Sequence, residues 1–419
     1  MICINCIHLE SLKRFVAKEG VFGKCQYCGI DGVCVAKDAM FDYIGVRIKE
    51  SFRTLDELTS YERGMFFYGS DNLSIKKYWE IVGDDYDIGG GELVEDLIEY
   101  LEVDFALDEE GDDLLYALDD GSLETNSFEA AWEVFVSRVH HEHRFFNDGA
   151  KNFLGSLFGF TCQGGNLKAD LITVLSDGDS LFRARKADNF EKLKKIEADP
   201  ARELGPAPNI LAGSQRMTPS GISAMYCATD RQTCLSEIRA VTGDLVVSAE
   251  FTPVTSMRFL DLRKLEVIAR FDMSPFDEGF TKASHAYQFL KGLIFKLSKP
   301  KGSGDEVAYI STQVVFEYLR IQFNKQVSGI VFPSVQTGGT GTNIVLFPEC
   351  TLVAQSGYSI ESEDPLGGHD PWGPPIPTIQ FKVGSARVHK IKAVVTESQD
   401  YVDATAYYIS EDPILSELL

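Results

Sequence analysis

Hydrophobic residues recur every three or four positions between about residues 38 and 165, which is the spacing of one buried helix face. Three such stripes stand out: Phe41, Ile44, Ile48 and Phe52; Leu93, Leu97 and Leu101; and Phe128, Trp132, Phe135 and Val139. We therefore predict an α-helical bundle over residues 38–165. Asn126 is expected to cap the third helix, with Glu129 at its third position.

The pattern changes from about residue 166, where short β-type runs alternate with helical segments. The runs are DLVVSAEF, MRFLDL, GIVFPS and NIVLFP, and the helical segments include QTCLSEIRAV and STQVVFEYLRIQF. This predicts an α+β domain over residues 166–358. Residues 359–379 are rich in Pro, Gly and acid, so we predict a linker there, and FKVGSARVHKIKAVVTES alternates as a strand pair would. Residues 359–419 are therefore assigned to a linker and a C-terminal β extension.

Cysteines are concentrated at the N-terminus, where five of the nine lie in the first 34 residues. Cys3 and Cys6 form one C-x2-C pair and Cys25 and Cys28 another, with 18 residues between the pairs. Two such turns complete a tetrahedral thiolate shell, so residues 1–36 are predicted to be a zinc ribbon with a structural zinc ion. Cys34 and His8 remain alternatives for the fourth ligand.

The chain of 419 residues has a formal net charge of −23, which opposes binding to nucleic acid unless a local basic patch exists. Acidic residues are concentrated between positions 84 and 124, where they could mimic a polyanion, although a solvated helix face with acidic loops is favoured. The sequence has no apolar run of about 18 residues and no signal-peptide pattern at its start. We expect a soluble, cytoplasmic protein without a membrane partner.

Polar residues set in short apolar or glycine-bearing stretches are scattered through the second half of the chain. They are Arg183 and Arg185 in SLFRARKAD, Arg216 in QRMTPSGISAMYCATD, Glu237 in TCLSEIRAV, and Ser334 and Asn343 in GIVFPSVQTGGTGTNIVLF. These segments do not adjoin in sequence, so only a folded domain could bring them together. We interpret them as the lining of a substrate pocket.

Residues 180–350 resemble the RES domain, a family of prokaryotic toxins that degrade NAD and whose fold is similar to that of ADP-ribosyltransferases. The motifs that carry the resemblance are LFRAR at 181–185, the stretch RMTPSGISAMYCATDRQTCLSEIR at 216–239, and STQ followed by GIVFPSVQTGGTGTNIVLF at 311–347. The resemblance implies a split sheet of the ADP-ribosyltransferase type. The N-terminal portion is similar to the zinc-ribbon and HEPN-type extension that some RES proteins carry.

This resemblance implies cleavage of the nicotinamide glycosidic bond of NAD, by hydrolysis or phosphorolysis. Guanidinium groups bind pyrophosphate with charge-assisted hydrogen bonds, and Arg183, Arg185 and Arg216 could supply them. Glu237 is the candidate that stabilises the oxocarbenium-like ribose and activates the acceptor. The family often has a Tyr directly after its first Arg, whereas Ala184 stands here, so the choice of anchoring arginine stays open.

The other assignments concern ligand placement. Tyr226, just before the Glu237 helix, is expected to stack on the nicotinamide ring. Ser334, at a strand end, and Asn343, after a glycine-rich turn, are expected to bond the ribose or a phosphate, with Ser334 and Arg183 counted beside Glu237 as catalytic candidates. The GGTGTN turn is not a P-loop, because it lacks the Lys-Ser/Thr that contacts phosphates.

Two other functions compete with NAD cleavage. One is a zinc-dependent interaction module that carries an inactive NAD-binding domain. The other is an RNase of the HEPN type centred on Arg138 and His143, which form an R-x4-H pair. His143 lies four residues after Val139, so we expect it on the same buried stripe, as a core or interface residue. RES toxins usually pair with an antitoxin, and the N-terminal half is predicted to sense, dock or restrain the catalytic half.

Overall fold

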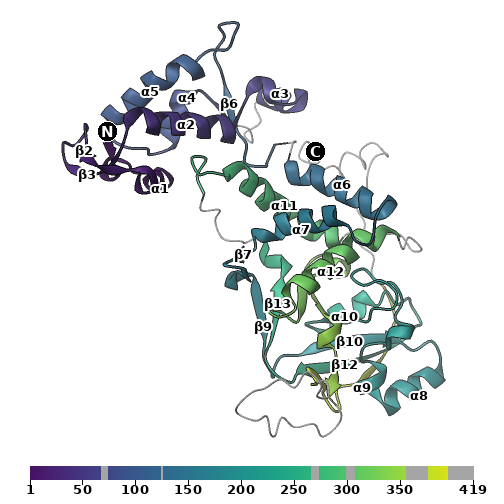
Figure 1. Ribbon diagram of the computed structural model, residues 1–419. Coiled ribbons are helices and arrows are strands. Elements are labelled where there is room, and N and C mark those ends of the chain that lie inside the picture. Colours follow the sequence, from purple (N-terminus) through teal and green to yellow (C-terminus); the bar gives the residue numbers. More distant parts are fainter. Residues whose placement is uncertain (68–73, 124–125, 266–272, 299–306, 355–375, 395–419) are drawn as a thin grey trace. The chain divides into compact units, whose positions relative to one another are not determined.

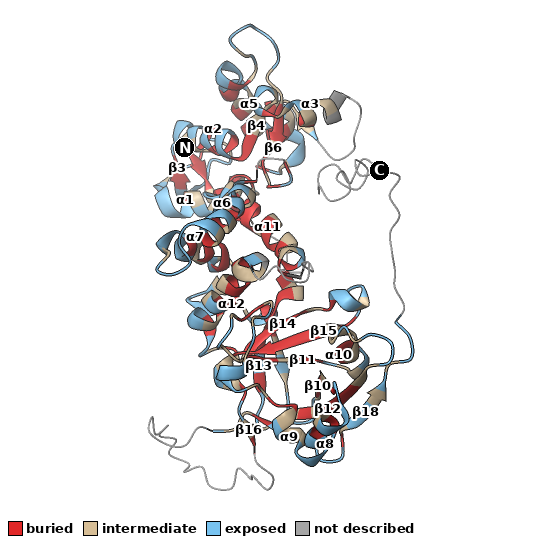
Figure 2. Ribbon diagram, turned by 90° about the vertical axis from the view of Figure 1, so that its right-hand side faces the viewer, coloured by how far each residue is buried: buried red, intermediate tan, exposed pale blue. Residues whose placement is uncertain are grey.

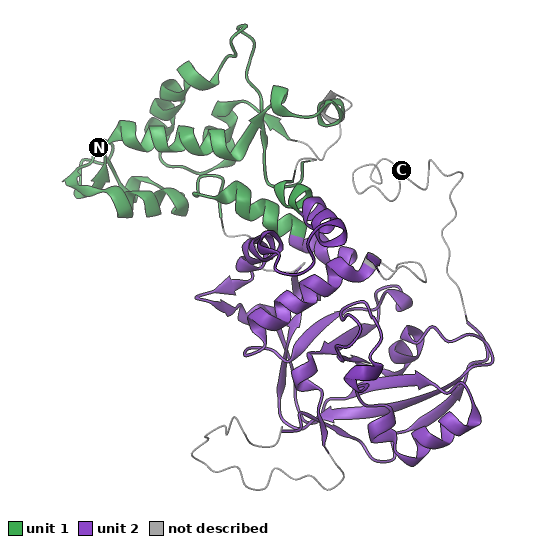
Figure 3. Cartoon of the chain, turned by 45° about the vertical axis from the view of Figure 1, so that its right-hand side comes forward, with its two compact units in different colours: residues 1–131, 269–289 green, residues 132–268, 290–419 purple. Residues whose placement is uncertain are grey.

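A computed structural model of the chain describes residues 1–67, 74–123, 126–265, 273–298, 307–354 and 376–394 (Figure 1). The chain forms two compact units, residues 1–131 with 269–289 and residues 132–268 with 290–419 (Figure 3). These units do not coincide with the modules predicted at 1–36, 38–165, 166–358 and 359–419, which stay predictions. One reason is that Phe276, from the middle of the chain, is fully buried in the hydrophobic cluster that contains Phe41 and Leu97.

The first unit begins with a small antiparallel sheet in the order β1-β3-β2. Its elements are β1 (Ile2–Cys3), α1 (Glu10–Glu19), β2 (Val21–Lys24) and β3 (Asp31–Val35). β3 is the central strand and pairs with both neighbours, so the two C-x2-C segments are held at one end of the sheet.

The remainder of the first unit is helical, as the stripes predicted, but it also contains a sheet. The helices are α2 (Lys37–Ser51), α3 (Ser60–Phe67), α4 (Tyr78–Glu80) and α5 (Gly91–Phe105). A three-stranded sheet in the order β4-β6-β5 joins β4 (Phe52–Thr54), β5 (Ile75–Lys76) and β6 (Tyr116–Leu118). The predicted helices are therefore present, and the structure adds a short sheet that the sequence pattern did not indicate. Strands of two or three residues are too short to leave an alternating pattern in the sequence.

The three predicted stripes are buried, as the red helix faces in Figure 2 show for the described residues. The third stripe lies on α6 (Ser127–His141). The predicted cap of α6 is confirmed, because Asn126 Oδ1 accepts hydrogen bonds from the backbone N–H groups of Phe128 (2.9 Å) and Glu129 (3.4 Å).

A buried histidine ties three segments of the first unit together. His285, at the start of α11 (Phe280–Ser298), accepts a hydrogen bond from the backbone N–H of Ser127 at Nδ1 (3.2 Å). Its Nε2 lies 2.7 Å from Oδ1 of Asp119, and Arg53 donates two hydrogen bonds to Oδ2 of that carboxylate. Burial alone would raise the pKa of Asp119, but the bonds from His285 and Arg53 hold it below its ordinary value. The network fixes where α6 begins.

The second unit is built on a ten-stranded mixed sheet. The strand order is β16-β17-β12-β10-β11-β15-β14-β13-β9, with β18 also paired to β12. Only β13 with β14 and β16 with β17 are parallel among the described pairs. The strands are β9 (Ile172–Leu175), β10 (Leu181–Lys186), β11 (Met225–Ala228), β12 (Leu245–Pro253), β13 (Met257–Asp261), β14 (Gly329–Pro333), β15 (Thr342–Leu346), β16 (Val353–Ala354), β17 (Ile379–Phe381) and β18 (Arg387–Lys390).

Helices cover this sheet as expected for an α+β domain. They are α7 (Asp148–Gly159), α8 (Phe190–Ala198), α9 (Pro200–Glu203), α10 (Arg231–Glu237) and α12 (Ile310–Phe323), and a small hairpin joins β7 (Cys162–Gln163) to β8 (Asn166–Leu167). α8 packs Leu193 and Ile196 against Leu181 and Phe251 of the sheet. Among the described residues, no helix combines the length and apolar character needed to cross a membrane.

The predicted C-terminal strand pair is wrong. β17 and β18 do not pair with each other; both run antiparallel to β12, at Phe251–Pro253 and Leu245–Ser248 respectively. The chain continues along one edge of β12 past Gly384 (φ +76°) and makes no hairpin reversal. Most of the predicted linker, residues 359–375, lies outside the described residues.

Candidate functional site

A cavity of about 590 Å³ lies between β10 and β11. The two strands share a single register pair, Phe182 with Ala228, although they are neighbours in the sheet. Beyond this pair they separate, and both line the cavity, β10 with residues 183–185 and β11 with residues 226–228. Its volume falls in the range of about 300–1,000 Å³ that is usual for small-molecule sites.

Glu237 is the only carboxylate among the described residues that line this cavity, and it is held by two other segments. Its Oε1 accepts hydrogen bonds from the Ser334 hydroxyl (2.5 Å) and from Asn343 Nδ2 (2.7 Å). No hydrogen bond from the described residues reaches Oε2. Asp230 starts α10 by accepting the N–H of Thr233 (2.8 Å), which places Glu237 at the end of this short helix. The structure thus brings together three of the predicted site residues.

A glycine turn between β14 and β15 sets the positions of Ser334 and Asn343. Gly338 and Gly339 have φ values of +60° and +83°, which favour glycine. The N–H of Ser334 donates to the carbonyl of Gly341 (2.8 Å). A Cβ at Gly341 would lie 2.2 Å from Oγ1 of Thr233, so the close contact between this turn and α10 requires glycine. The glycines serve to pack the turn against the Glu237 helix.

Ser334 does not contact the cavity in the predicted way. It is fully buried, and the described residues that line the cavity do not include it. Its hydroxyl is directed to Glu237, whereas we expected it to reach a ribose or phosphate. Asn343 both lines the cavity and bonds Glu237. Ser334 is therefore a residue that positions Glu237.

Arg183 and Arg185 point to the same side of β10 but differ in their partners. Arg183 is 9% exposed, and its Nη1 is buried without a hydrogen-bond partner among the described residues. Burial, with a smaller effect of Arg185, lowers the pKa of Arg183 to about 10, so it still carries its charge at neutral pH. Arg185 instead donates from Nη2 to the carbonyl of Gly205 (2.7 Å). A buried guanidinium nitrogen without a partner is costly and is suited to receive an anion.

Two residues of α12 hold the loop that carries Arg216. Thr312 donates its hydroxyl to the carbonyl of Arg216 (2.6 Å). Gln313, which is 9% exposed, donates from Nε2 to the carbonyl of Gln215 (2.8 Å) and to two further acceptors of the same loop. Sequence reasoning noted the STQ motif but gave these side chains no role. The only signal in the sequence for a role of Thr312 and Gln313 was their position in the STQ motif at 311–313.

Tyr226 lines the cavity and also fixes this loop, because its hydroxyl accepts the backbone N–H of Met217 (2.9 Å). Burial raises the pKa of Tyr226 to about 12, so the phenol stays neutral. Its expected stacking on a nicotinamide ring stays a prediction.

The cavity is strongly positive within an acidic protein. Its charged lining residues are Arg183, Arg185, Arg216 and Arg239 with Glu237, whereas the whole chain has a net charge of −23. Arg239 was not among the predicted site residues. Such a local concentration of guanidinium groups favours a ligand with several negative charges.

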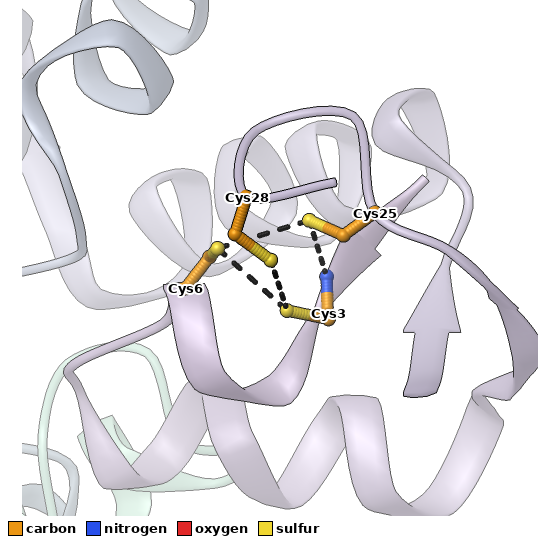
Figure 4. A group of neighbouring side chains, drawn as sticks. All are labelled: Cys3, Cys6, Cys25 and Cys28. Carbon is orange, nitrogen blue, oxygen red and sulfur yellow. Dashed lines mark hydrogen bonds between the residues drawn. The ribbon is translucent and has the colours of Figure 1, made fainter. Parts of the chain in front are cut away.

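The four cysteines of the two C-x2-C pairs converge in the first unit (Figure 4). Their sulfur atoms lie within 4.8 Å of one another, and Cys3 Sγ is 3.6 Å from the sulfurs of both Cys6 and Cys28. Four sulfurs at about 2.3 Å from one tetrahedral metal ion would lie about 3.8 Å apart, so the cluster fits such an ion. Cys34 instead donates to the carbonyl of Gly23, so it is not part of the cluster.

His8 is likewise outside the group of converging ligand atoms, and its Nδ1 lies 2.7 Å from Asp87 Oδ1.

The expected burial of His143 is wrong. α6 ends at His141, so the helical phase that buries Val139 does not extend to residue 143, and His143 is exposed. Arg138 is also exposed, and its carbonyl accepts the N–H of His143 (3.0 Å).

Two family models match the chain. The model described as the RES domain matches residues 180–363. The model described as HEPN/RES N-terminal domain 1 matches residues 18–153. No curated protein matches the sequence significantly.

Proposed function

Because the chain belongs to the RES family and carries an N-terminal region of the HEPN/RES type, we propose that its C-terminal domain cleaves the nicotinamide glycosidic bond of NAD. The observation that supports this most strongly is Glu237, fixed by Ser334 and Asn343 at the wall of an arginine-rich cavity. A carboxylate beside several guanidinium groups suits a substrate that is anionic at one end and becomes cationic at the reacting carbon.

In this proposal the arginines bind the pyrophosphate of NAD. Arg183 is the preferred anchor, because its Nη1 has no partner among the described residues, whereas Arg185 is engaged by Gly205. A phosphate oxygen would supply the missing hydrogen bond and offset the cost of burying the charge. Arg216 lines the same cavity on a loop that α12 holds in place.

Glu237 would act on the ribose. When the bond between C1′ and the nicotinamide nitrogen breaks, the electron pair leaves with nicotinamide and positive charge develops on the ribose. A fixed carboxylate stabilises that charge and can accept a proton from an attacking water, while phosphate would attack as an anion. The two donors on Oε1 hold the carboxylate in one orientation.

The proposal extends to the rest of the chain. The resemblance to RES toxins suggests that depletion of NAD arrests growth, with an antitoxin as partner. The cysteine cluster is proposed to hold a structural zinc ion through Cys3, Cys6, Cys25 and Cys28, which would stabilise the fold of the first unit. The first unit would then sense a signal, dock a partner or restrain the catalytic domain.

Release of free nicotinamide from NAD by the purified full-length protein tests the proposed function. Glu237→Gln keeps the size of the side chain and an oxygen acceptor for Ser334 but removes the charge, so we expect nicotinamide release to fall by about 100-fold or more. Glu197→Gln, at an exposed position of α8, serves as the matched control and should leave the rate unchanged. Absence of release from the wild type, or equal rates for both variants, would refute the proposal. Running the assay with and without phosphate identifies the acceptor.

A further inference from the structure

Arg239 has a backbone conformation that is unfavourable for its residue type. Its φ is +49°, and it follows Ile238, which caps the C-terminus of α10. This left-handed position after a helix is usually glycine, because a Cβ there is crowded by the backbone. Arg239 therefore carries a conformational cost that glycine would not have.

No contact of the Arg239 side chain with the described residues explains why this conformational cost is tolerated. It is exposed at the wall of the cavity, and no hydrogen bond or ion pair joins its guanidinium to a described residue. Backbone strain that persists without a local stabilising contact is often found where the side chain has a function. An arginine near a helix C-terminus can also interact with the helix dipole, so a structural role must be tested as the alternative.

The surroundings of Arg239 indicate an anionic ligand. It lies two residues after Glu237, and Arg183 and Arg216 line the same cavity. Arg185 already donates one hydrogen bond to Gly205, whereas no described residue accepts a hydrogen bond from the guanidinium of Arg239. The anionic groups of a nicotinamide nucleotide are its phosphates, and a guanidinium binds phosphate by charge-assisted hydrogen bonds.

We propose that Arg239 binds a phosphate group of the substrate, so that the cavity prefers phosphate-bearing nicotinamide nucleotides to nicotinamide riboside. This inference rests on the proposed function, because it takes a nicotinamide nucleotide as the ligand. It adds a specificity residue that the sequence did not indicate. It also predicts that replacing Arg239 by glycine stabilises the fold and weakens the binding of NAD.

Calorimetric titration with NAD and with nicotinamide riboside tests the inference. All proteins carry Glu237→Gln to prevent turnover, alone or together with Arg239→Gly, Arg239→Lys or Arg202→Gln. Loss of one charged hydrogen-bonding group corresponds to about a tenfold or larger rise in the Kd of NAD for Arg239→Gly, with less than a twofold change for nicotinamide riboside. Arg239→Lys should retain most of the NAD affinity. Arg202→Gln removes an exposed charge of α9 outside the cavity and should change neither Kd.

Thermal unfolding separates a binding role from a structural one. Arg239→Gly relieves the backbone strain, so its Tm should rise although NAD binding weakens. An unchanged Kd of NAD overturns the inference, and so does equal weakening of both ligands together with a lower Tm, which indicates a structural role. Nicotinamide release by the wild type is measured separately. A protein that binds NAD through Arg239 but releases no nicotinamide would refute the proposed function and leave this inference standing.

Discussion

Removal of one hydroxyl group tests how the proposed catalytic carboxylate is held. Ser334 is fully buried, and its Oγ donates to Oε1 of Glu237 over 2.5 Å. Ser334→Ala deletes this donor and leaves Asn343 bonded to the same oxygen at 2.7 Å. Ser334 does not line the cavity, so the substitution should not remove a direct contact with the substrate.

The size of the effect follows from the chemistry of the lost bond. A hydrogen bond to a charged group contributes about 1.5–3 kcal/mol. Each 1.36 kcal/mol added to the barrier slows a reaction about tenfold. If the bond is fully used to orient Glu237 in the transition state, Ser334→Ala should lower kcat by about 10-fold to 150-fold. KM for NAD should change by less than about threefold, because substrate contacts are retained.

The assay is steady-state nicotinamide release by four proteins: wild type, Ser334→Ala, Glu237→Gln and the double variant. Because Ser334 is inferred to act only through Glu237, Ser334→Ala should have little further effect when Glu237 is already replaced. Equal loss of kcat in both backgrounds would contradict this reasoning. A rise in KM with unchanged kcat would show instead that Ser334 binds the substrate directly.

Three further predictions concern the turn, the loop and the metal cluster. Gly341→Ala places a methyl group in contact with α10, so we expect a loss of about 1–3 kcal/mol in the free energy of unfolding and lower activity, whereas Gly178→Ala, which has open space around it, should be neutral in denaturant titrations. Thr312→Val removes the hydroxyl that holds the loop carrying Arg216, which is proposed to bind the substrate, so KM for NAD should rise while Thr312→Ser stays close to wild type in the same kinetic assay. Native mass spectrometry should find one zinc ion that is lost in Cys3→Ser but retained in Cys34→Ser, and a protein that is stable without metal would contradict the zinc assignment.

Features that depend on local spacing were predictable from the sequence. The helical stripes are buried where the period of 3.6 residues placed them, and Asn126 caps α6 as its position before Ser127 and Glu129 indicated. The cysteine quartet also converges, because each C-x2-C segment brings two thiolates together within one turn. Such features require only a few consecutive residues to adopt one conformation.

Features that depend on where a segment ends or returns were not predictable. His143 is exposed because α6 stops two residues before it, and no strong breaker in the sequence marks that end. The two C-terminal strands share an edge of β12. That partner strand is more than a hundred residues away in the chain, so local spacing could not indicate the pairing. Phe276 is buried in the core of the first unit. The sequence could not show this, because a hydrophobic residue does not specify which core will bury it.

The sequence by itself determined which residue types are available to the site: the arginines, the glutamate, the serine and the asparagine, in their order along the chain. Only the tertiary structure decided their contacts. Ser334 and Asn343 are 97 and 106 residues from Glu237, and they meet it because strand register and the glycine turn direct them to one oxygen. The difference between Arg183 and Arg185, and the presence of Arg239 at the cavity, likewise arise from burial and backbone geometry. Side-chain direction changes with every residue along a strand, so contacts at such separations are fixed only when the sheet is assembled.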